Sequence, residues 1–71
     1  MRFKNLEAEF ARIGLSVEEI GNELGFAKCV IYNRLANKTK WTLNDMLKVQ
    51  KFVNEKLKEH FTLDYLFAKG D

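Results

Sequence analysis

Two short helices are predicted on either side of Gly25, and this joint constrains the fold more than any other feature of the sequence. Ser16 and Glu19 form a capping-box pattern that begins one helix, which ends at Leu24 because Gly25 can take the left-handed conformation. A new apolar repeat that includes Ile31 starts only two residues later. Two helices of about eight residues, joined by a short turn that contains glycine, form a helix-turn-helix.

A turn this short makes the two helices cross steeply, so a small residue is needed where they meet. Gly21 supplies it on the first helix of the pair. Phe26, Ile31 and Leu35 are expected to hold the second helix against the rest of the chain. The outer face of that helix then carries four residues: Lys28, Cys29, Tyr32 and Asn33.

Three further helices are predicted, and there is no strand signal. The first covers about residues 3–13, ends before Gly14, and has apolar residues at helical spacing: Leu6, Phe10 and Ile13. Thr42 and Asp45 begin a helix that extends to about residue 58. A short last helix follows Thr62, where Leu63 and Leu66 are expected to close the core. The sequence therefore predicts an all-α fold.

The composition excludes most catalytic and metal-binding classes. The chain has 71 residues, one cysteine and one histidine, which suits one small domain and allows neither an internal disulfide nor a four-ligand zinc site. Its apolar runs are short, so no membrane span is expected, and its charged start is unlike a signal peptide. No nucleophile–base pair can be assembled, so we expect a non-enzymatic protein without cofactor or metal, with its carboxylates on exposed helix faces.

The net charge of +2 hides an uneven distribution along the chain. Residues 15–25 carry three glutamates and no base, for a charge of −3. Residues 26–41 carry four bases and no acid, for a charge of +4: Lys28, Arg34, Lys38 and Lys40. The flanking windows carry +1 and 0. A basic window of this kind is either a solvated face or a surface for an anionic partner such as nucleic acid.

The segment SVEEIGNELGFAKCVIYNRLANKT, residues 16–39, resembles the phage repressor/Cro-type helix-turn-helix family, also described as lambda-repressor-like or XRE. The similarity continues through Lys40-Trp41-Thr42 to the apolar residues at 63–67 and covers nearly the whole chain. It implies one five-helix domain over residues 1–71, with the motif at about 16–36 and the C-terminal helices at about 42–68. Trp41 is expected to pack beneath the loop before it, as an aromatic does in the family.

The resemblance also implies a DNA-binding surface. The second helix of the motif would lie in the major groove and read base edges through Lys28, Cys29, Tyr32 and Asn33. The loop that follows would hold phosphates through side chains and backbone N–H groups of Asn37, Lys38, Thr39 and Lys40. Arg34 either reaches a phosphate or covers the core with its stem. Val17 and Ala27 depart from the family pattern. Val17 stands where the family has a glutamine and Ala27 where it has a capping serine or threonine, and both of those side chains contact phosphate.

The function implied is a sequence-specific transcriptional regulator of phage or prophage repressor/Cro type. It would bind double-stranded DNA at a palindromic operator as a homodimer, in the cytoplasm of a bacterial or phage-infected cell. Tyr65 and Phe67 are the candidates for the dimer contact, with plain packing as the alternative. A second hypothesis is a protein-interaction module on the same fold, either a modulator or antirepressor that pairs with a phage repressor, or an antitoxin-like binder.

Overall fold

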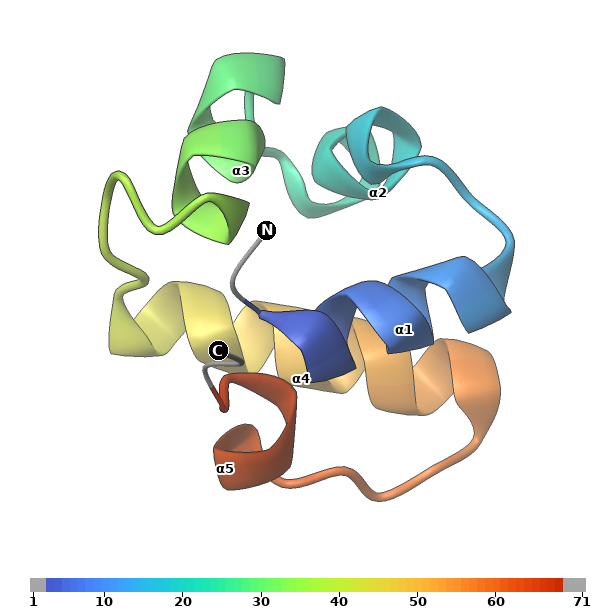
Figure 1. Cartoon of the computed structure of the whole chain (residues 1–71). Helices are drawn as coiled ribbons and strands as arrows, with labels where there is room; N and C mark the ends of the chain where they lie inside the picture. The colour runs from blue at the N-terminus through green and yellow to red at the C-terminus, as the bar shows by residue number, and fades with distance from the viewer. Residues whose placement is uncertain (1–2, 69–71) are drawn as a thin grey trace.

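The computed structural model describes residues 3–68, and this part of the chain forms five helices without a strand (Figure 1). They are α1 (Lys4–Ile13), α2 (Val17–Leu24), α3 (Lys28–Leu35), α4 (Leu43–Leu57) and α5 (Leu63–Leu66). α1 packs against α4 and α5, whereas α2 packs against α3 and α4. In Figure 1, α2 and α3 lie on one side of α1 and α4, and α5 lies on the other. The predicted all-α class is confirmed.

Local capping signals set the ends of the helices. The Ser16 hydroxyl accepts a hydrogen bond from the Glu19 N–H, and the Glu19 carboxylate accepts one from the Ser16 N–H, so the predicted capping box is confirmed. The hydrogen bond from the Ser16 backbone N–H is the main cause that lowers the pKa of the Glu19 carboxyl. Thr42 and Thr62 cap α4 and α5 in the same way through their hydroxyls. Gly25 ends α2 with a φ of +81°, in the left-handed region predicted for it.

The α2–α3 pair is held by a close approach at Gly21. A Cβ atom placed on Gly21 would lie 3.1 Å from the Cγ2 of Ile31 and 3.4 Å from the carbonyl oxygen of Phe26. The Phe26 N–H donates to the Gly21 carbonyl at 2.7 Å, which fixes the turn directly onto α2. Gly21 is therefore the small residue at the helix contact that the sequence predicts.

One core joins all five helices and both ends of the described chain. Its buried apolar members are Phe3, Leu6, Phe10, Ile20, Leu24, Ile31, Leu35, Trp41, Val49, Val53 and Leu66. Trp41 is buried as expected, with its ring centroid 5.1 Å from that of Phe67 and 6.4 Å from that of Phe3. Leu63, expected in the core beside Leu66, is only half-buried.

The observed bounds of α1 and α4 agree with the predicted ones to within one residue. α1 is Lys4–Ile13, and Phe3 is its N-cap and places its ring in the core. α4 ends at Leu57, because Lys58 takes the left-handed conformation with a φ of +55°. The expectation that all carboxylates lie on exposed faces was wrong for Glu9, which is 4% exposed because α5 covers it with Tyr65.

Replacing Gly21 with valine should destabilise the protein by about 1–3 kcal/mol, because the added methyl groups would overlap Ile31 in a packed interior. Urea unfolding followed by circular dichroism measures the loss. Asn22→Val is the matched control, since it puts the same side chain on the exposed face of α2. An equal loss in both variants would mean that a valine anywhere on α2, and not the contact with Ile31, sets the effect.

Candidate nucleic-acid interface

The four predicted base-reading residues lie together on the outer face of α3. Lys28, Cys29, Tyr32 and Asn33 are all exposed, while Ile31 and Leu35 on the opposite face are fully buried. Their spacing of one and four residues places them on two successive turns of one helix. We call these four residues the reading face.

The first turn of α3 has no side-chain cap and no acid of its own, although the Glu18 carboxylate of α2 lies beside Lys28. Ala27 occupies the N-cap position without a side-chain hydrogen bond, as the departure from the family pattern predicts, and no acidic residue lies in the first turn. The unpaired N–H groups and the helix dipole at this end favour an anion. Lys28 is the first residue of the helix, where a lysine is disfavoured by the dipole, so its place there is not explained by helix stability.

The loop at residues 37–40, here the basic loop, is attached to the C-terminal end of the reading face. The Asn33 carbonyl accepts from the Lys38 N–H at 2.8 Å and from the Thr39 N–H at 3.4 Å. Asn37 takes the left-handed conformation with a φ of +62°. These bonds place the exposed side chains of Lys38, Thr39 and Lys40 beside α3. They also occupy two of the backbone N–H groups that were expected to contact phosphate, so the side chains remain for that role.

Arg34 does not lie with the other bases of this window. Its guanidinium forms an ion pair with Asp45 and sits over two rings, 5.4 Å from the centroid of Phe26 and 5.6 Å from that of Trp41. Its side chain is 17% exposed. Of the two roles open for Arg34 in the sequence, this geometry is that of a side chain covering the core.

The two candidates for a dimer contact differ in exposure. Phe67 is half-buried and packs its ring against Trp41 and Phe3. Tyr65 is 38% exposed, and its ring stacks on Phe61 with the centroids 5.0 Å apart. Of the two, Tyr65 is therefore the one with more exposed surface for a contact between copies.

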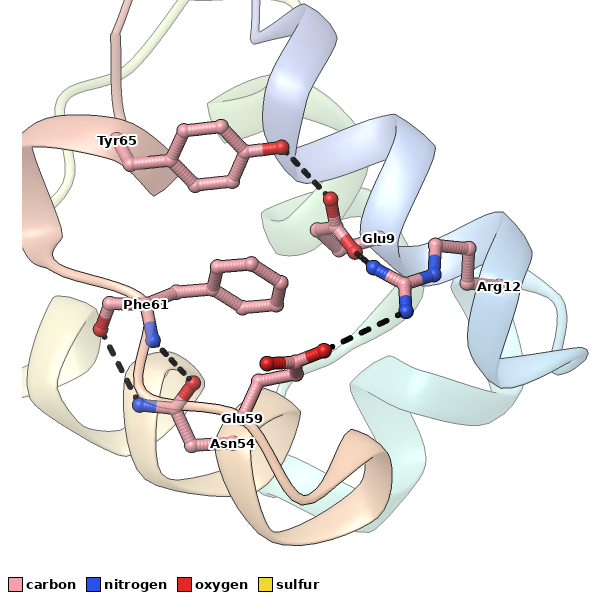
Figure 2. Close-up of polar contacts among 6 residues, drawn as sticks. All are labelled: Glu9, Arg12, Asn54, Glu59, Phe61 and Tyr65. Atoms are coloured by element: carbon pink, nitrogen blue, oxygen red, sulfur yellow. Dashed lines mark hydrogen bonds and ion pairs between the residues drawn. The ribbon is translucent and has the colours of Figure 1, made fainter.

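A polar cluster holds α5 and the segment before it onto the body of the protein (Figure 2). The Tyr65 hydroxyl donates to Glu9 at 2.7 Å, and Arg12 bridges Glu9 and Glu59. The bond to Glu9 raises the pKa of Tyr65. The Asn54 side chain pairs with the backbone N–H and carbonyl of Phe61. This cluster limits how far Tyr65 can move.

Two charged residues outside the predicted set lie beside the reading face and the turn before it. The Glu18 carboxylate on α2 is 3.6 Å from the Lys28 ammonium, and both side chains are exposed. The Lys48 ammonium on α4 is 5.2 Å from the ring centroid of Phe26. Each comes from a helix other than α3, so no spacing along the sequence could assign it.

Residues 3–68 hold no group of three histidine, cysteine or acidic side chains that could bind a metal ion. Among the same residues, no helix is both long and apolar enough to cross a membrane. No protein-family model matches the chain, and no curated protein or solved structure is significantly similar to it.

Replacing Asp45 with asparagine should lower the free energy of unfolding at pH 7 by about 1.5–3 kcal/mol, the usual range for a hydrogen bond to a charged group. The hydrogen bond from Arg34 lowers the pKa of Asp45 below its ordinary value of 3.8. The carboxylate therefore stabilises the fold fully above pH 3.8, and this contribution is lost as the pH falls through the lower folded pKa.

Urea unfolding between pH 7 and pH 2 measures this difference, which should shrink below pH 3.8. Asp64→Asn is the matched control, because Asp64 is also a first-turn helix acid but is exposed. A difference between wild type and Asp45→Asn that stays constant down to pH 2 would contradict the role of the ion pair.

Proposed function

We propose that the protein is a sequence-specific DNA-binding transcriptional regulator of phage repressor/Cro type, with α2 and α3 as its helix-turn-helix. The observation that carries this proposal is the surface made by the reading face and the basic loop. It joins an exposed helix face to an exposed loop, and it contains bases and polar groups but no acid of its own. An α-helix fits the major groove, and a basic loop beside it fits the phosphate backbone.

The residues of the reading face suit base edges in different ways. Lys28 can donate to the O6 and N7 atoms of guanine, and Asn33 can pair with the N6 and N7 atoms of adenine. Cys29 and Tyr32 offer softer contacts, such as one to a thymine methyl group. Phosphates would be held by four side chains of the basic loop: Asn37, Lys38, Thr39 and Lys40. Arg34 is not included, because its guanidinium is paired with Asp45 and packed against two rings.

A homodimer on a palindromic operator would supply the specificity that one α3 lacks. One helix meets few base pairs, and each good contact discriminates by about 1–3 kcal/mol, so two half-sites roughly double the total. The described chain measures 29 × 26 × 21 Å. Half-sites one helical turn apart are separated by about 34 Å, which is more than any of these extents, so the two reading faces would have to point away from the contact between the copies. Tyr65 remains the better candidate for the contact between copies.

The exposed acids of α2 favour a second candidate function, a protein-interaction module that pairs with a phage repressor or acts like an antitoxin. Glu18, Glu19 and Glu23 are all exposed, and Val17 offers no hydrogen bond to phosphate. Co-purification with a protein encoded beside it, combined with an absence of DNA binding by the isolated protein, would support this candidate over the first.

Selection from a pool of random duplexes at low salt tests the proposal. Enrichment of one palindromic sequence is expected, and enrichment of none would contradict DNA-sequence recognition. Within the selected site, Asn33→Ala should remove preference at one position, at a cost of about 1–3 kcal/mol for the preferred base. Asn22→Ala is the matched control, because Asn22 is an exposed asparagine on α2 outside the reading face.

Lys38→Ala should weaken binding to all sequences alike, because a phosphate contact carries no base information. The slope of log affinity against log salt concentration should fall by about 0.9, the value for one phosphate contact. Titrations by fluorescence anisotropy at several salt concentrations measure both effects. Lys51→Ala removes another exposed lysine, on α4, and should leave the slope nearly unchanged. Equal changes in both variants would mean that total charge, and not the basic loop, drives binding.

A further inference from the structure

An ion pair between Glu18 and Lys28 links α2 to the start of the reading face. It joins the second residue of α2 to the first residue of α3, with the carboxylate and the ammonium 3.6 Å apart. Both side chains are at least half exposed, at 52% and 65%. An exposed ion pair contributes little to stability, so this pair can change partners at low cost.

The pair presents a donor and an acceptor side by side at the start of the reading face. In the major groove, a G·C pair presents the O6 acceptor of guanine beside the N4 donor of cytosine. These two atoms are hydrogen-bonded to each other in the base pair and are therefore about 2.9 Å apart. The spacing of the Glu18 and Lys28 charges is close to this distance, with the opposite hydrogen-bonding character at each end.

We propose that Glu18 is a specificity-determining residue that reads one G·C base pair together with Lys28. Lys28 donates to the O6 and N7 atoms of guanine, and Glu18 accepts from the N4 amino group of cytosine. This inference rests on the proposed function, since it assigns a further residue to the same surface. It also gives Glu18 a role that a solvated acidic face would not have.

The pairing predicts an order of preference among the four base pairs at this position. G·C gives Lys28 two acceptors and Glu18 a donor. T·A is second, because thymine O4 gives Lys28 one acceptor and adenine N6 still gives Glu18 a donor. A·T and C·G rank last, since each brings a base oxygen acceptor, thymine O4 or guanine O6, toward the carboxylate. Without Glu18, the A·T and C·G base pairs no longer bring a base oxygen against a carboxylate.

The test compares wild type, Glu18→Gln and Glu23→Gln by selection from random duplexes, followed by titration of the four base-pair variants of the selected site. Wild type is expected to follow the order above. Glu18→Gln should reduce discrimination against C·G at one position by roughly tenfold, since a glutamine amide offers both a donor and an acceptor. Glu23→Gln removes the same charge from the exposed face of α2 and should change the affinity for all sites alike.

The outcomes separate this inference from the proposed function. If wild type enriches a sequence and Glu18→Gln discriminates against C·G as strongly as wild type does, the proposed function stands and the role of Glu18 is wrong. An equal loss of discrimination in both variants would assign the effect to charge and would also overturn it. If wild type enriches no sequence, both proposals fail. Thermal unfolding of each variant checks that the fold is intact, as expected for substitutions at exposed positions.

Discussion

The contact between Gly21 and Ile31 is the constraint on which the rest of the structure depends. A Cβ atom on Gly21 would lie 3.1 Å from the Cγ2 of Ile31, so a larger residue at this crossing of α2 and α3 would require Ile31 to shift. This close approach lets the short turn at Gly25 bring Ile31 and Leu35 into the core. The opposite face of α3 is then left outside, and the reading face is a consequence of how the interior is packed.

The exposed acids and bases of residues 17–40 lie on different elements. α2 carries exposed acids, whereas α3 and the basic loop carry the bases, and the two sets meet at Glu18 and Lys28. Arg34, the base nearest the core, is withdrawn from the surface by Asp45 and the rings of Phe26 and Trp41. Of the four bases at residues 26–41, the three that remain exposed are therefore Lys28, Lys38 and Lys40.

Features that depend on neighbouring residues could be predicted from the sequence, and those that depend on distant pairs could not. The capping box at Ser16, the left-handed Gly25 and the small residue at position 21 follow from local conformational preferences, as does the outward position of Lys28 and Asn33. The bond between Tyr65 and Glu9 joins residues 56 positions apart, and the pair of Arg34 with Asp45 joins two helices. No periodicity reports such pairings, so the burial of Glu9 and the loss of Arg34 from the surface appear only in three dimensions.

The aromatic packing of Phe3, Trp41 and Phe67 has a consequence for how the protein acquires its fold. Rings from near the start, the middle and the end of the described chain meet in one place, with Phe3 and Phe67 6.1 Å apart between centroids. Small helical proteins usually fold through local contacts and do so quickly. Here the last contacts of the core span nearly the whole described chain. During synthesis the complete set of these ring contacts can therefore form only after residue 67 has been added.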